Sequence, residues 1–195
     1  MFHVPFDERV KCNTYRYSTL GYPSLYLASS LLTSLKECDY DNPENYYCSC
    51  FKSTKQLTFV DLSYSSIATD FTEKYSFLVF YPLIVACSQK VREPNMPFKP
   101  EYIITQHLFQ VIRLHNNVIE IDGITYTSTK YDDVLFTNDS RRNFVMYILD
   151  SVKEKGYSEE LAKKFISTKP LRCLSEIDLS EINSCCAHYD DILSN

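Results

Sequence analysis

The sequence predicts an α+β fold in a single domain that spans residues 1–195. The chain is 45% hydrophobic, and a chain of this length should bury roughly 70% of its unfolded surface, so it can form a core without disulfides. Strand-like and helix-like segments are interspersed without the regular strand–helix–strand spacing of a doubly wound sheet. We find neither an internal repeat nor a linker that would divide the chain.

Short alternating or apolar segments predict the strands, because side chains along a strand alternate between two faces. The first is rich in Tyr and Thr, and a turn at Gly21-Tyr22-Pro23 separates it from the second. The expected strands are residues 14–20, 25–28, 56–63, 118–121 with 123–127, and 143–149.

Apolar residues at helical spacing predict the helices. Ser29 or Ser30 can cap the first helix, because a serine oxygen accepts from an early free amide. The helix expected at residues 72–90 is so apolar that we expect it to be mostly buried, with a kink or a new turn at Pro82. The expected helices are residues 31 to about 38, 72–90, 100–114 and 158–165, whereas residues after Lys169 give no clear signal.

Charge and hydropathy exclude several classes of partner. The net charge is −5, which argues against a nucleic-acid footprint because neutralising phosphates takes clustered Lys and Arg. The most apolar run, residues 77–87, is shorter than the about 20 residues that cross a bilayer. The first residues show no basic stretch followed by an apolar core, so we expect a cytoplasmic protein whose eight cysteines are reduced.

The cysteines, histidines and glycines do not form the usual metal or phosphate motifs. Cys48-Ser49-Cys50 and the Cys185-Cys186 pair lack the two-pair zinc spacing, and the four histidines lack a metalloprotease pattern, so we expect no metal. The three glycines are too scattered to form a phosphate-cradling loop. No residue pattern selects a Cys–His nucleophile, although a cysteine-dependent enzyme stays an alternative.

Arg16, Tyr26 and Glu37 are the strongest candidates for chemistry, and they lie within the single segment 15–38. A guanidinium can hold phosphate in two places. An aromatic face can stack on a nicotinamide ring, and a carboxylate can bind a ribose hydroxyl and stabilise an oxocarbenium-like transition state. Taken singly, each residue is more often an ordinary surface or packing residue.

Residues 123–130, Gly-Ile-Thr-Tyr-Thr-Ser-Thr-Lys, are the second segment of interest. Gly123 is expected to allow a turn before the strand. Ser128 would present a small hydroxyl near the strand end, suited to a phosphate or a ribose. The alternative is a strand-end serine bonded to its own backbone.

Together these motifs resemble the RES family, named for its Arg, Glu and Ser. The family pattern has an Arg, a Tyr in a Leu-Tyr-Leu/Ala strand, a helix ending near a Glu, and a Gly-Ile-x-Tyr-x-Ser-x-Arg segment. The chain looks most like longer bacterial members that open with Met-Phe-His-x-Pro-Phe, and the matching segments cover about residues 1–150 but not 151–195. Those segments are Arg16, Tyr17–Gly21, Leu25-Tyr26-Leu27, Glu37, Tyr102–Gln106 and Gly123–Lys130. Lys130 replaces the final Arg of the pattern, and Thr105 stands where Pro is common.

The resemblance implies an ADP-ribosyltransferase-like fold, with a split and mostly antiparallel sheet flanked by helices. Family members degrade NAD by hydrolysis or phosphorolysis, some transfer ADP-ribose to a protein, and several are toxins of toxin–antitoxin pairs. By resemblance, Arg16 would bind a phosphate or ribose of NAD, Tyr26 would stack on nicotinamide, and Glu37 would stabilise the ribosyl cation or orient the acceptor. The implied NAD-binding residues are Arg16, Tyr17, Tyr26, Ser128 and Lys130.

We therefore expect an enzyme that cleaves the nicotinamide–ribose bond of NAD, with water, inorganic phosphate or a protein side chain as acceptor. The resemblance also implies an antitoxin protein as a partner, and we expect a homo-oligomer. The alternatives are a protein-modifying ADP-ribosyltransferase and a catalytically silent module that binds NAD or another nucleotide.

Overall fold

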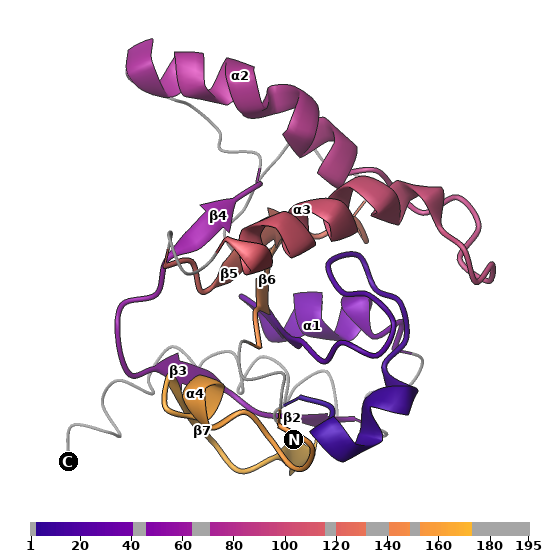
Figure 1. Ribbon diagram of the computed structural model, residues 1–195, viewed down its shortest axis with the longest axis vertical. Helices are drawn as coiled ribbons and strands as arrows, with labels where there is room; N and C mark the ends of the chain where they lie inside the picture. Colours follow the sequence, from indigo (N-terminus) through magenta and orange to yellow (C-terminus); the bar gives the residue numbers. More distant parts are fainter. Residues whose placement is uncertain are drawn as a thin grey trace.

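A four-stranded sheet lies at the centre of the molecule in this computed structural model (Figure 1). Its strand order is β1 (Leu25–Ala28), β6 (Arg142–Met146), β5 (Gly123–Thr127) and β4 (Phe59–Asp61). The β1–β6 and β6–β5 pairs are antiparallel, whereas β5–β4 is parallel, so the predicted α+β class is confirmed. The structure describes residues 3–40, 46–63, 71–115, 120–131, 141–148 and 153–172.

Two long helices cover one face of this sheet. Helix α2 (Phe71–Cys87) and helix α3 (Ile103–Leu114) lie together at the top of Figure 1. Their apolar side chains form one core cluster with Ile124 of β5 and Val145 of β6. The short 3-10 turn η3 (Pro100–Tyr102) leads into α3, as expected for the helix at residues 100–114.

The other face of the sheet packs against the N-terminal turn and the C-terminal part of the described chain. The 3-10 segment η1 (Phe6–Lys11) and helix α4 (Glu159–Ala162) contribute to a second core cluster with Leu25 and Met146. Two small sheets lie on this side, and the sequence predicted none of their four strands. They pair β2 (Tyr47–Cys48) with β8 (Leu171–Arg172), and β3 (Phe51–Ser53) with β7 (Phe165–Ser167).

Helix α1 (Leu31–Glu37) follows β1 directly and ends at the candidate carboxylate. Its cap is Ser30, whose hydroxyl oxygen accepts from the Thr33 amide at 3.2 Å, so the predicted start of this helix is confirmed. The cap fixes where the first turn begins and therefore where Glu37 falls on the last turn.

The strand predicted at residues 14–20 is wrong. Tyr15 and Ser18 form an isolated bridge across a tight turn, with Arg16 and Tyr17 at its tip. Its backbone groups bond across the turn and to side chains of other elements, so this segment does not join the sheet. The strand expected at 118–121 begins outside the described residues, and Ile121 itself is not in a strand.

The expectation that α2 is mostly buried is also wrong. Ile84 and Cys87 are buried in the core, but Leu78 is 68% exposed, and its neighbours Val79 and Phe80 are exposed as well. A single helix buries only the stripe that faces its neighbours, and a uniformly apolar sequence does not reveal which stripe that is. Within the described residues no helix has the length and apolarity needed to cross a membrane.

The turn expected at Gly123 is not formed, because Gly123 is the first residue of β5. A Cβ atom there would lie 2.1 Å from the Val145 carbonyl oxygen, so glycine is needed for the close approach of β5 to β6. The cysteine expectation fails at one position, because Cys50 is disulfide-bonded, whereas Cys12, Cys38 and Cys87 are free.

Candidate active site

The turn that carries Arg16 is held by helix α3. The Thr105 hydroxyl donates to the Arg16 carbonyl oxygen, and the Gln106 amide donates to the Tyr15 carbonyl oxygen at 2.8 Å. Both donors lie on the first turns of α3. The helix therefore fixes the backbone on either side of the Arg16 side chain.

The Arg16 guanidinium is buried, with the residue only 7% exposed. Nη1 donates to the Cys87 carbonyl oxygen at 3.0 Å, and Nη2 donates to Thr129 Oγ1 at 3.1 Å. The guanidinium carbon also lies 5.3 Å from the centre of the Tyr102 ring. Among the described residues no carboxylate forms an ion pair with Arg16, although the pKa of the nearby Glu101 carboxyl is lowered by backbone hydrogen bonds and, to a smaller extent, by this cation.

Tyr26 stands on the sheet face that α2 and α3 cover. Its partner across the β1–β6 pair is Val145, and its ring joins the core cluster on that side, whereas Leu25 and Leu27 face the other cluster. The Tyr17 amide donates to the Tyr26 hydroxyl oxygen at 3.2 Å. Burial raises the pKa of Tyr26 above its ordinary value, so its phenol is neutral at physiological pH.

Glu37 is held by two donors from the sheet. Ser128 Oγ and Asn143 Nδ2 each donate to the same oxygen, Oε1, at 2.6 Å. Ser128 and Asn143 are almost fully buried, whereas Glu37 is half-buried. Hydrogen bonds to a carboxylate are short and strong, so this pair of bonds fixes the carboxylate plane.

The sheet explains why these donors meet. Ser128 follows β5 directly, two residues after Tyr126, and Asn143 is the register partner of Tyr126 on β6. Side chains alternate along a strand, so Ser128 and Asn143 lie on the same face as Tyr26. Sequence reasoning missed Asn143, although an amide inside an apolar strand is an unusual residue to bury and was the available signal.

The candidate side chains come from separated segments of the chain but lie close together. They are Arg16, Tyr26, Glu37 and Ser128. Arg16 bonds Thr129, the neighbour of Ser128, and Ser128 in turn bonds Glu37. Both charges act on Tyr102: burial raises its pKa, the Arg16 cation opposes the shift and the Glu37 carboxylate adds to it. A cation, a carboxylate and an aromatic side chain therefore lie close together.

Tyr17 and Lys130 lie differently from these four side chains. The Tyr17 ring is fully buried in the core, with its centre 4.6 Å from that of Tyr126, so only its backbone amide reaches Tyr26. Lys130 lies at the rim and forms an ion pair with the exposed carboxylate of Asp39.

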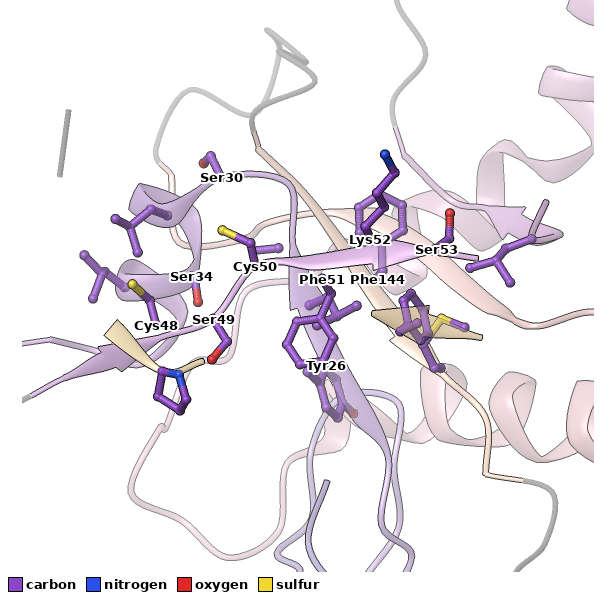
Figure 2. Close-up of a pocket in the computed structure, with 18 of the residues that line it drawn as sticks. Tyr26, Ser30, Ser34, Cys48, Ser49, Cys50, Phe51, Lys52, Ser53 and Phe144 are labelled. Atoms are coloured by element: carbon purple, nitrogen blue, oxygen red, sulfur yellow. The ribbon is translucent and has the colours of Figure 1, made fainter. Parts of the chain in front are cut away.

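A separate cavity lies between α1, β1 and the β2–β3 segment (Figure 2). Its volume is about 890 Å³, and Figure 2 shows Cys48, Ser49 and Cys50 following one another along it. Leu27 and Phe144 line it from the sheet face opposite to Asn143, and neither Arg16 nor Glu37 does. Tyr26 lies at its border, but this cavity is not the place where the candidate residues meet.

Cys12, Cys38 and Cys87 are poorly suited to nucleophilic chemistry at neutral pH. Burial raises the thiol pKa of Cys12, Cys38 and Cys87, and the neighbouring Glu37 carboxylate adds to the shift at Cys38. A raised pKa lowers the fraction of reactive thiolate. No group of three or more potential metal ligands occurs within the part of the chain that the structure describes.

Comparison with known proteins finds one informative similarity. The chain is 29% identical over 187 residues to a protein of Bacillus subtilis (strain 168) named "Putative toxin YopC". The match covers 88% of this chain and 42% of that protein, so the chain spans less than half of the relative's length. No protein-family model matches the chain, and no solved structure matches it. Most of this chain is thus similar to one part of a bacterial protein named as a toxin.

Proposed function

We propose that the chain consumes NAD by cleaving the bond between nicotinamide and ribose. The observation that carries this proposal is the buried Arg16 guanidinium, which forms no ion pair with a carboxylate among the described residues. It bonds Thr129, whose neighbour Ser128 bonds Glu37. A buried cation without a directly bonded carboxylate is suited to an anionic ligand, and a guanidinium fits phosphate well. The pyrophosphate of NAD would supply that charge.

Cleavage of this bond does not need a strong general acid. The nicotinamide of NAD is already cationic, so it leaves with the bonding electron pair as a neutral molecule. Positive charge then develops on the ribose carbon, and the acceptor oxygen forms the new bond and loses its proton. The enzyme has to hold the two ends of the dinucleotide and stabilise that charge.

The candidate residues divide these tasks between them. Arg16 would anchor the pyrophosphate, and the Tyr26 ring would flank the nicotinamide. The Glu37 carboxylate would stabilise the ribosyl cation, since its charge is worth most where positive charge appears. Ser128 holds that carboxylate through its bond to Oε1. These roles agree with the resemblance to the RES family noted in the sequence.

A toxic role follows from the same chemistry. NAD consumption without control would stop metabolism, and the similarity to a bacterial protein named as a toxin supports this reading. An antitoxin that covers the site would be the expected partner.

Incubating the purified chain with NAD, with and without inorganic phosphate, tests the proposal. We expect nicotinamide release, and the second product identifies the acceptor: ADP-ribose for water, its phosphate ester for phosphate, or a modified protein for transfer. Stoichiometric NAD binding without turnover at high enzyme concentration would instead identify a silent binding module and overturn the proposal. Loss of activity on thiol alkylation would point to the cysteine-dependent alternative.

A further inference from the structure

The hydrogen bonds of Glu37 distinguish its two carboxylate oxygens. Both donors, Ser128 Oγ and Asn143 Nδ2, bind Oε1. Oε2 accepts no hydrogen bond from any residue that the structure describes. One oxygen is thus saturated by the protein, and the other is left for a different partner.

We infer that Asn143 is a positioning residue, whose amide clamps Glu37 Oε1 so that Oε2 is the oxygen presented to the reacting ribose. This inference rests on the proposed function and adds a residue that the sequence motifs do not include. Asn143 acts through Glu37 and needs no contact of its own with NAD.

The position of Asn143 suits a rigid clamp. It lies on β6 between two neighbours, paired in register with Ala28 on β1 and with Tyr126 on β5. It is only 3% exposed, so its side chain has little freedom to turn away. A donor on a central strand defines a direction more sharply than a donor on a loop.

The place of Glu37 explains why a clamp is needed. Glu37 is the last residue of α1, where the unpaired carbonyls of the helix end disfavour a carboxylate. Its side chain is only partly buried, and a glutamate side chain has three rotatable bonds to restrain. Two short bonds to one oxygen offset the carbonyl repulsion and select one orientation.

The test compares steady-state kinetics of the wild type, Asn143→Ala and Asn143→Leu, which is close in size to asparagine but has no donor. We expect kcat for nicotinamide release to fall about 10- to 100-fold in each, as for the loss of a hydrogen bond to a charged group, while KM for NAD stays within about twofold. Thr125→Val, on the other face of the same sheet, is the matched control and should retain wild-type kcat. Thermal melting verifies that each variant is folded. The kinetic test can be made with one Asn143 variant if the other does not fold.

The decisive readout is the double variant with Glu37→Gln. If Asn143 acts through Glu37, adding Asn143→Ala to Glu37→Gln lowers kcat little further, because the two losses share one cause. If the losses multiply, or if both Asn143 variants keep wild-type kcat, Asn143 is only a structural residue and the inference is wrong. An inactive wild type would instead refute the proposed function, so the two failures are distinct.

Discussion

Arg16 is the residue whose surroundings are hardest to explain without a ligand. Its guanidinium is buried, bonded only to a carbonyl and a hydroxyl, and lies against the Tyr102 ring. Its hydrogen-bond partners are neutral, and the Glu101 carboxylate interacts with it only at a distance, so burial of the charge is unfavourable. An anionic ligand would offset the unfavourable free energy of burying this charge, and the same attraction would bind the ligand.

Replacing Arg16 with alanine should therefore weaken the binding of NAD. We expect Arg16→Ala to raise KM for NAD about 10- to 100-fold, the effect of removing a hydrogen-bonded charge from a phosphate. Steady-state kinetics of nicotinamide release measure KM directly. Arg172→Ala, which removes an exposed arginine on β8, is the control and should bind as the wild type does. Equal KM values for Arg16→Ala and the wild type would show that Arg16 does not bind the pyrophosphate.

Tyr26 is expected to have separable structural and binding roles. Its hydroxyl accepts from the Tyr17 amide and bonds Ser18 Oγ at 3.1 Å, so it ties the Arg16 turn to β1. Tyr26→Phe should lower stability by about 1–2 kcal/mol, because a half-buried amide loses its partner, and should lower Tm by a few degrees. The ring stays in place, so kcat should change much less than in Tyr26→Ala. A large loss of kcat in the folded Tyr26→Phe variant would show that the hydroxyl itself takes part in the reaction.

At the scale of elements, four of them define the site. Helix α1 ends at Glu37, the β5–β6 pair supplies Ser128 and Asn143, and α3 holds the Arg16 turn. The site therefore depends on how closely β5 and β6 approach, which Gly123 permits. A shift of β5 would move Ser128 away from the carboxylate.

Gly123→Ala tests that dependence. A Cβ atom 2.1 Å from a backbone oxygen has no room, so the strands must separate, and we expect a loss of at least about 3 kcal/mol with loss of activity. Gly156→Ala is the control: nothing lies near its Cβ position, and its φ of 74° should cost about 1–2 kcal/mol only. Urea unfolding compares the two. If Gly123→Ala is no less stable than Gly156→Ala, the close strand approach does not limit this fold.

Local signals predicted the elements that local physics determines. The Ser30 cap, the apolar spacing of α3 and the alternation around Tyr26 each follow from a few neighbouring residues, and those elements were confirmed. Arg16 was expected in a strand because its segment is rich in Tyr and Thr, but partners on α3 and β1 make it a turn. The contact of Asn143 with Glu37 joins residues 106 positions apart, and no local pattern encodes it.

For the whole molecule, the comparison concerns a part rather than the full length of the relative. The chain covers 42% of the Bacillus subtilis protein, so toxicity of the isolated chain is a question of its own. The described fold brings Arg16 close to Ser128 and Glu37 through the contact of Arg16 with Thr129. The homo-oligomer, the antitoxin and the cytoplasmic location stay predictions.

Expression in a bacterial host should therefore arrest growth and deplete cellular NAD. We expect Glu37→Gln, produced at the same level, to leave growth and NAD unchanged, because the carboxylate charge is what promotes bond cleavage. Viable counts and extracted NAD, followed after induction, measure both effects. Equal arrest by the two proteins would mean that toxicity arises from something other than this site.

The central claim, that one site binds NAD through Arg16 and cleaves it with Glu37, is tested most directly by nicotinamide release at saturating NAD. The wild type should release nicotinamide with multiple turnovers, and Glu37→Gln should be slower by about 100-fold or more, the loss expected when a main stabiliser of transition-state charge is removed. Calorimetry should find NAD bound to that variant with near-wild-type affinity. An unchanged rate of release in Glu37→Gln would contradict the claim.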